Sequence, residues 1–273
     1  MLAGCMREDL RFKRVWDGLA GRKSSEEIVF GPCLAHKYSR RQDSVYFASL
    51  EKVLNIRPSD VVLDIGCGPL ARAENYFSQK DFGIVGVDVS FGILKKARDS
   101  VRKYGSEEQV GLVLGDAEFL PFRGDSFRVI LCIGLISHLP SRLSVVNSLR
   151  EIRHCLTEDG ICYVDWLQNL YSLLGLQQEL IYKVPDSSNA SRVQLLHFRG
   201  LKEVRSLFKQ AELKISKIFF GPLIQALTPF YHLFPTFVKN AVDKLASIMD
   251  RLHEKYPILA SFAYSFDVVT EKY

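Results

Sequence analysis

The sequence predicts an α/β protein with a Rossmann-like, doubly wound sheet of seven strands, of which the last is antiparallel. Short apolar runs alternate with helical segments between residues 61 and 165, as in a parallel sheet that helices cover on both faces. The first run ends in the glycine turn Gly66-Cys67-Gly68, which is typical of a strand that bends sharply into a helix. A last apolar run near the C-terminus supplies the antiparallel strand.

The composition is that of a globular protein. Hydrophobic residues make up 47% and charged residues 25% of the 273 residues, which excludes bulk disorder and suffices for one large domain or a compact domain with an accessory piece. The net charge of +5 is too small to require nucleic acid. Because the six cysteines are scattered without CxxC spacing, we expect no disulfide framework, no zinc site and a cytoplasmic location.

The N-terminal segment, residues 1–56, is predicted to be helical with a break at Gly31-Pro32. Residues 44–54 place four apolar side chains near one helix face, and Pro58 ends this helix. The four residues are Val45, Leu50, Val53 and Leu54. Nine basic and five acidic side chains fall within residues 1–41, as in a solvated helical face or a contact with an anionic partner.

Five short apolar runs predict the parallel strands of the core, and three helical stretches predict the connections between them. Ser90 is placed to cap the middle helix, because a serine hydroxyl can accept a hydrogen bond from a free amide of the first turn. The predicted strands span residues 61–65, 84–88, 111–116, 127–133 and 161–164. The predicted helices span residues 71–79, 91–104 and 143–156.

The C-terminal part is predicted to complete the sheet and to cover it. A helix at 201–210 precedes a sixth strand at 213–220, and a seventh strand at 262–270 enters as its antiparallel partner. Residues 218–238 carry no charge and are long enough to span a membrane, but three prolines would break such a helix repeatedly. We therefore interpret this stretch as an apolar lid, followed by an amphipathic helix at 237–252.

Acidic residues follow the strands at the carboxyl edge of the predicted sheet. Asp88 ends the second strand, where a carboxylate can accept hydrogen bonds from both hydroxyls of a ribose. Asp116 ends the third strand, and Asp64 lies two residues before Gly66, where it is placed to hold an ammonium group. These residues predict a site for an adenosine-type cofactor. The spacing Gly66-x-Gly68-x-x-Ala71 also fits the dinucleotide fingerprint, so a nicotinamide-dependent oxidoreductase stays an alternative.

In combination, these motifs resemble the class I S-adenosylmethionine-dependent methyltransferases, in the broad group that includes the quinone-biosynthesis enzymes. The resemblance covers residues 58–165 well and 196–220 weakly. It is carried by VVLDIGCG (61–68), IVGVDVS (84–90), GDAEFLPF (115–122), DSFRVILCIGLISHL (125–139) and LREIRHCLTEDGICYVD (149–165). The resemblance implies in-line transfer of a methyl group from S-adenosyl-L-methionine to a small, hydrophobic or aromatic acceptor.

The resemblance also implies roles for individual residues. It places the methionine end of the cofactor at the glycine turn, the ribose at Asp88 and the adenine at Asp116. The predicted cofactor-binding residues are Asp64, Gly66, Cys67, Gly68, Asp88, Val89, Asp116, Ala117, Ile133 and Tyr38. The predicted acceptor-binding residues are Tyr46, His138, Trp166 and His197. His138 is also the candidate catalytic base, where the acceptor must lose a proton.

One position departs from the family pattern. Leu70, preceded by Pro69, stands where the family usually has a further glycine, so either the turn takes another path or cofactor affinity is reduced. The same departure supports a second alternative, a cofactor-binding protein without catalytic activity. The basic N-terminal residues support a third, an RNA methyltransferase.

The predicted organisation has four parts. A helical cap precedes the cofactor-binding core, and an acceptor-pocket segment with the lid and the sixth strand precedes the last strand. Their bounds are 1–56, 57–165, 166–258 and 259–273. The expected partner is a small-molecule acceptor, with no metal, no nucleic acid and no membrane span, and with a homodimer left open.

Overall fold

The fold is described from a computed structural model. The described residues are 13–25, 28, 36–80, 82–104, 107–168, 183–185, 192–194, 197, 199–220 and 265–273. The predicted break at Gly31-Pro32, the helix at 237–252 and nearly all of the predicted lid lie outside them. Within the described ranges, no helix is both long enough and apolar enough to cross a membrane.

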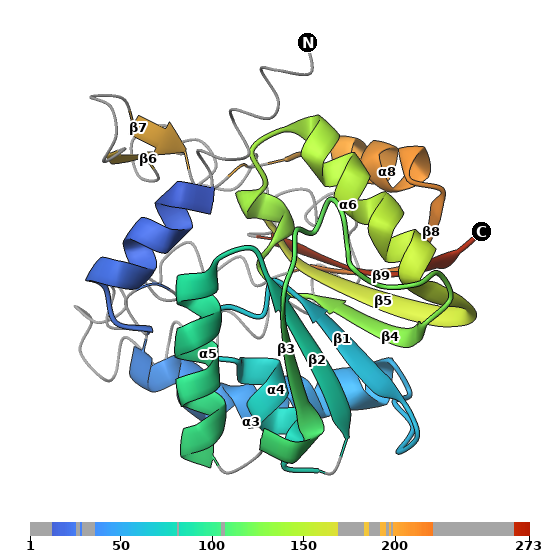
Figure 1. Cartoon of the computed structure of the whole chain (residues 1–273). Coiled ribbons are helices and arrows are strands. Elements are labelled where there is room, and N and C mark those ends of the chain that lie inside the picture. The colour runs from blue at the N-terminus through green and yellow to red at the C-terminus, as the bar shows by residue number, and fades with distance from the viewer. Residues whose placement is uncertain are drawn as a thin grey trace, which may run out of the picture.

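A single seven-stranded sheet forms the centre of the molecule, with strand order β3-β2-β1-β4-β5-β9-β8 (Figure 1). Strands β1 to β5 are parallel, and β9 runs antiparallel to both of its neighbours. This arrangement confirms the predicted fold class. The strands are β1 Val61–Ile65, β2 Gly83–Asp88, β3 Val110–Leu114, β4 Phe127–Cys132, β5 Leu156–Gln168, β8 Leu213–Phe220 and β9 Ser265–Lys272. A separate antiparallel pair joins β6 Lys183–Pro185 to β7 Arg192–Gln194.

Strand β5 is longer than the apolar run that predicted it. The run ends before Asp165, but β9 continues to pair with β5 as far as Leu167 and Gln168. Backbone pairing therefore extends the strand through a buried polar residue that the apolar pattern does not mark. In contrast, β3 ends at Leu114, and Asp116 lies in a turn beyond the strand.

Helices cover both faces of the sheet (Figure 1). Helices α3, α4 and α5 lie on one face, and α6 and α8 lie on the other. Their bounds are α3 His36–Val53, α4 Arg72–Ser78, α5 Phe91–Tyr104, α6 Arg142–Cys155 and α8 Leu201–Gln210. A further helix at residues 13–22 precedes α3, and short 3-10 turns form η1 Glu107–Gln109 and η2 Ile136–His138.

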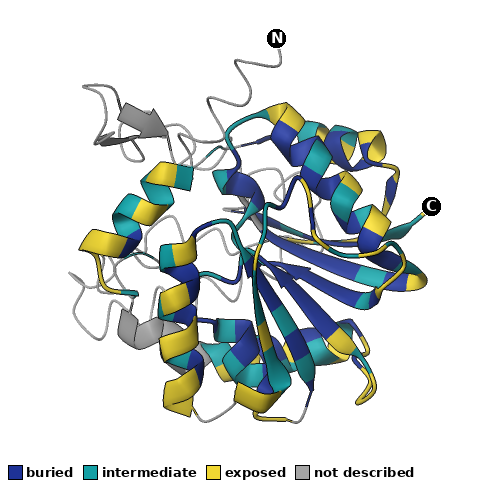
Figure 2. Ribbon diagram, viewed as in Figure 1, coloured by how far each residue is buried: buried dark blue, intermediate teal, exposed yellow. Residues whose placement is uncertain are grey.

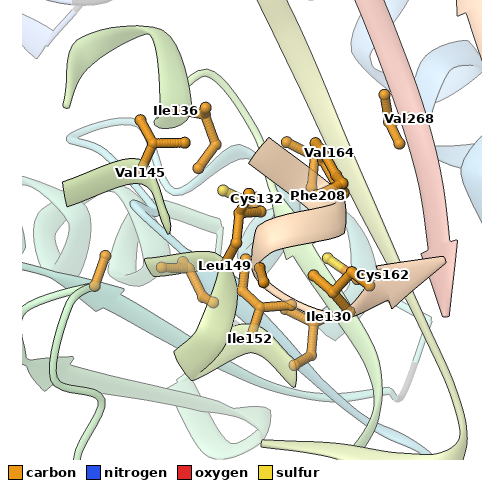
Figure 3. Close-up of a cluster of buried hydrophobic side chains, with 14 of the residues drawn as sticks. Ile130, Cys132, Ile136, Val145, Leu149, Ile152, Cys162, Val164, Phe208 and Val268 are labelled. Carbon is orange, nitrogen blue, oxygen red and sulfur yellow. The ribbon is translucent and has the colours of Figure 1, made fainter. Parts of the chain in front are cut away.

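Most residues of the central strands are buried (Figure 2). Their apolar side chains pack in separate clusters on the two faces of the sheet. On the face of α6 and α8, side chains such as Ile130, Leu149 and Phe208 meet in one cluster (Figure 3). On the other face, α3 buries Phe47 and Leu50 against α4 and the sheet. The prediction that Val45 lies on this buried face is wrong, because Val45 is 65% exposed. The buried positions instead follow the spacing of Phe47, Leu50 and Leu54, which is that of one helical face.

Ser90 joins the N-terminus of α5 to the helix at residues 13–22. Its hydroxyl accepts a hydrogen bond from the Ile93 amide at 3.2 Å, which confirms the predicted cap, and donates one to Asp17 Oδ1 at 2.5 Å. Gly92 allows the two helices to approach closely, because a Cβ at that position would lie 2.8 Å from the Cβ of Ala20.

We expect Ser90→Ala to lower the free energy of unfolding by about 1–2 kcal/mol, because it removes a helix cap and a second buried hydrogen bond. The matched control is Ser141→Ala, which removes the cap of α6. The half-buried Ser141 accepts from the Ser144 amide at 3.0 Å, and its second hydrogen bond, to Ser144 Oγ at 2.9 Å, stays within the same turn. Urea denaturation should show the larger loss for Ser90→Ala. An equal or smaller loss would contradict the docking role of Ser90.

Candidate functional site

A cavity of about 200 Å³ opens at the carboxyl ends of β1 to β4. The strand order reverses between β1 and β4, and ligands of open α/β sheets bind at such a switch point. The turns after all four strands contribute to the wall, and the helix at residues 13–22 faces them with Lys13 and Trp16. The cavity is therefore built from the segments that the sequence marked with glycines and acidic residues.

The glycine turn after β1 forms the floor of the cavity. Gly66 and Gly68 have φ angles of 81° and 64°, in the left-handed region that favours glycine. The amides of Gly66 and Cys67 donate to the carbonyl of Val87 at 2.8 and 3.0 Å, which ties the turn to β2.

The turn takes a path that needs no glycine at position 70. The next left-handed residue is Ala71, with φ 45°, which directly precedes α4. The carbonyl of Leu70 accepts hydrogen bonds from Asn75 Nδ2 at 2.9 Å and from Ser100 Oγ at 2.7 Å. At the departure from the family pattern, Leu70 itself is not left-handed, and its carbonyl keeps the turn hydrogen-bonded.

Asp88 stands at the end of β2 with its carboxylate at the cavity wall. Oδ2 accepts a hydrogen bond from the Gly68 amide at 3.3 Å, and Oδ1 accepts one from the Ser90 amide at 3.0 Å. Burial raises the pKa of Asp88 to about 6, and Asp17 adds to the rise. These bonds fix the orientation of the carboxylate toward the cavity and leave lone pairs free for hydroxyl donors.

Asp116 reaches the same cavity from the turn after β3. Its Oδ1 accepts a hydrogen bond from the Glu118 amide at 2.9 Å, and its carbonyl accepts one from the Phe119 amide at 3.0 Å. Ala117 and Glu118 also line the cavity, and Glu118 accepts a hydrogen bond from Asn147 Nδ2 at 3.0 Å. The turn is therefore rigid, and it presents backbone and carboxyl groups to one end of the cavity.

Asp64 lies beneath the turn and faces Glu74 of α4. Both side chains are buried, and among the described residues no donor reaches Asp64 Oδ1 or either carboxyl oxygen of Glu74. Burial raises the pKa of Asp64 to about 7 and raises that of Glu74 well above its usual value. We infer that the two carboxyl groups share one proton at neutral pH, because a buried pair of like charges is strongly unfavourable.

His138 lines the cavity from η2, after β4. Its ring meets that of Trp16 edge to face, with 5.3 Å between the centroids. The turn behind it is supported by the His197 amide, which donates to the Ser137 carbonyl at 2.7 Å. The imidazole of His138 is thus the titratable ring at the wall formed by the β4 turn.

A polar network supports the same wall from behind. The amide of Gly134, which lines the cavity, donates to Asp165 Oδ1 at 2.7 Å, and the Tyr46 hydroxyl donates to Asp165 Oδ2 at 2.5 Å. Burial and the neighbouring Asp267 raise the pKa of Asp165 to about 8. Asp165 therefore positions the β4 turn from the end of β5.

Comparisons with known proteins identify relatives for the part of the chain that forms this cavity. Residues 62–160 match the family described as a methyltransferase domain. Over 100 residues the chain is 35% identical to methyltransferase GfsG of Streptomyces halstedii, and these residues cover 36% of each protein. Over 127 residues it is 29% identical to (+)-O-methylkolavelool synthase of Herpetosiphon aurantiacus, with 46% of this chain and 44% of that protein covered. The matches therefore span less than half the length of these relatives.

Residues 62–160 form a class I S-adenosylmethionine-dependent methyltransferase domain. Solved structures share the fold beyond this range. The PH0226 protein of Pyrococcus horikoshii superposes with a TM-score of 0.59 at 20% identity, covering 92% of this chain and 100% of that one. The geranyl diphosphate C-methyltransferase of Streptomyces coelicolor superposes with a TM-score of 0.58 at 14% identity, covering 86% and 80%.

The methyltransferase domain brings most of the predicted cofactor-binding residues to the cavity wall. Those that line it are Gly66, Gly68, Asp88, Val89, Asp116, Ala117 and Ile133. Asp64 and Cys67 do not line it: Asp64 lies beneath the turn, and Cys67 packs against Leu94 and Ala97 of α5. Tyr38 belongs to α3, but its side chain lies outside the described residues.

The predicted acceptor-binding residues are more dispersed. His138 lines the cavity, whereas Tyr46 binds Asp165 behind the wall and His197 supports η2 through its backbone. Burial, with a contribution from Arg199, lowers the pKa of His197. Trp166 belongs to β5, and its side chain lies outside the described residues.

Sequence reasoning missed residues that come from segments far from the family motifs. Trp16 enters from the N-terminal helix, and Arg72 enters from the start of α4, where it lines the cavity beside the glycine turn. Asp165 is the last residue of the motif at 149–165, but the sequence predicted no role for it. Neither Trp16 nor Arg72 belongs to a recognisable spacing, but a charged residue directly after the glycine turn was a signal for Arg72.

Proposed function

We propose that this protein is an S-adenosylmethionine-dependent methyltransferase that acts on a small hydrophobic acceptor. The proposal depends above all on one observation. Asp88 and Asp116, at the ends of neighbouring strands, border one cavity together with the glycine turn at the switch point of the sheet. This arrangement supports an enzyme over a structural α/β protein, because each of these groups lines the same cavity.

The residues of the cavity fit the cofactor. The Asp88 carboxylate would accept the two ribose hydroxyls, and the turn at Asp116 and Ala117 would hold the adenine edge. The glycine turn would let the backbone approach the amino-acid part of the cofactor. Among the described residues, only the Gly66 carbonyl oxygen lies within 4 Å of a Cβ added at Gly68. When bound, S-adenosylmethionine supplies an activated methyl group on a positively charged sulfur.

The protein's own part in the reaction is to align the acceptor and to exclude water. Trp16 and His138 meet across the cavity, so the N-terminal helix and the β4 turn close one side of it. Where the acceptor atom carries a proton, the imidazole of His138 is the group that lines the cavity in position to accept it. No other group is required to move a proton.

Apolar surroundings favour a hydrophobic acceptor. Near His138, the wall includes Trp16, Ile133, Leu135 and Leu139. The uncharged sequence at 218–238 would extend this apolar surface as the lid, within an acceptor segment at 166–258. The names of several similar proteins point the same way, since they include (+)-O-methylkolavelool synthase and a sterol 24-C-methyltransferase.

Transfer of a labelled methyl group to a panel of acceptors tests this proposal. We expect the full chain to label terpenoid or other apolar acceptors and to leave RNA unlabelled. In parallel, calorimetry should detect S-adenosylhomocysteine binding, and reduced nicotinamide cofactor should not bind. Binding of S-adenosylhomocysteine without labelling of any acceptor would favour a silent binding protein, and labelling of RNA alone would replace the proposed acceptor class.

A further inference from the structure

Arg72 is a charged residue of the cavity wall that the family motifs do not assign. It follows the left-handed Ala71 and begins α4, and its side chain is 24% exposed. Arg72 follows the glycine turn after β1, and β1 is separated from β3 by β2 in the sheet. It therefore gives the wall a permanent positive charge on the β1 side of the cavity.

The orientation of this guanidinium is fixed before any ligand binds. Nε and Nη2 donate to Asp43 Oδ1 of α3 at 3.1 and 2.5 Å. The guanidinium carbon also lies 5.8 Å from the centroid of the Phe47 ring. In the described part of the chain, Nη1 has no hydrogen-bond acceptor. A rigid guanidinium with a free amino group is suited to bind a carboxylate, because little side-chain entropy remains to be lost.

The strand order determines which part of a nucleoside ligand would reach Arg72. In the order β3-β2-β1-β4, Asp116 follows β3, Asp88 follows β2, and the glycine turn with Arg72 follows β1. A ligand whose adenosine occupies the ends of β2 and β3 therefore extends its amino-acid part past the glycine turn. Besides Arg72 and His138, the described wall has one more basic side chain, Lys13. It comes from the helix at residues 13–22.

We propose that Arg72, held by Asp43, binds the α-carboxylate of the amino-acid part of the cofactor. This inference rests on the proposed function and adds a specificity residue to it.

A comparison of two ligands isolates the carboxylate. The full-length protein is titrated by calorimetry with S-adenosylhomocysteine and with its decarboxylated analogue, which lacks only that group. We expect the wild type to prefer S-adenosylhomocysteine by about 10- to 100-fold, the range of a charge-assisted hydrogen bond. Arg72→Met should lose this preference, with affinity for the decarboxylated analogue kept within about twofold.

Two further variants control the experiment. Lys13→Met removes a positive charge from the same cavity and should retain the preference between the two ligands. Arg72→Lys keeps the charge without the planar fork and should retain part of the preference, which decides the matter if Arg72→Met fails to fold.

The outcomes separate the inference from the proposed function. Binding of S-adenosylhomocysteine by the wild type, with an undiminished preference in Arg72→Met and Arg72→Lys, would overturn the role of Arg72 alone. An equal loss of affinity for both ligands in Arg72→Met would also overturn it. A wild type that binds neither ligand would overturn the proposed function and this inference together.

Discussion

Asp88→Ala is expected to weaken the binding of S-adenosylhomocysteine by about 100-fold or more. The proposed site uses both oxygens of this carboxylate for ribose hydroxyls, and each hydrogen bond to a charged group contributes about 1.5–3 kcal/mol. Calorimetry measures the effect directly. Asp99→Ala, on the exposed side of α5, is the matched control and should bind like the wild type.

Asp88 also supports the unbound structure, because it accepts hydrogen bonds from the Gly68 and Ser90 amides. Asp88→Asn keeps the shape and one acceptor oxygen, and we expect it to bind about tenfold more weakly than the wild type. Because the pKa of Asp88 is about 6, wild-type affinity should fall as the pH drops below 6, and that of Asp88→Asn should not. Wild-type affinity in Asp88→Ala would contradict the ribose site.

The protein is expected to be less stable at pH 8 than at pH 5, because of the buried pair Asp64 and Glu74. Their pKa values are raised in the folded state, so the folded protein holds protons that the unfolded chain releases above about pH 4.5. For each additional proton that the folded state binds, the free energy of unfolding falls by about 1.4 kcal/mol per unit rise in pH.

Glu74→Gln removes this dependence, because a neutral amide has the shape of the protonated carboxyl group and can donate to Asp64. Urea denaturation should show nearly equal stability of the variant and the wild type at pH 4.5, and a more stable variant at pH 8. The exposed Glu108→Gln is the matched control and should keep the wild-type slope. An unchanged slope in Glu74→Gln would show that the pair does not share a proton.

The local pattern of the sequence was sufficient to predict the sheet and its connections. Helix α5 has the predicted bounds, 91–104, because Ser90 caps it and apolar residues recur on one face. The pattern failed where distant segments decide the structure. Strand β5 continues past Asp165 because β9 pairs with it, and α3 buries Phe47 where Val45 was expected.

The candidate site was predictable to the extent that it follows single strands. Asp88 and Asp116 lie at strand ends, and their position at the cavity follows from the parallel sheet. Glu74 and Arg72 were not predictable as site residues, because their surroundings come from other elements. Arg72 depends on Asp43 of α3, and Glu74 fits because a Cβ at Gly86 of β2 would collide with its carboxyl group.

A crystal structure of the full chain with S-adenosylhomocysteine would locate the cofactor site. We expect ribose density within hydrogen-bond distance of both Asp88 oxygens, with the adenine at Asp116 and Ala117 and the carboxylate at Arg72. Ligand density elsewhere, or an empty cavity at a ligand concentration well above the measured Kd, would contradict the proposed site.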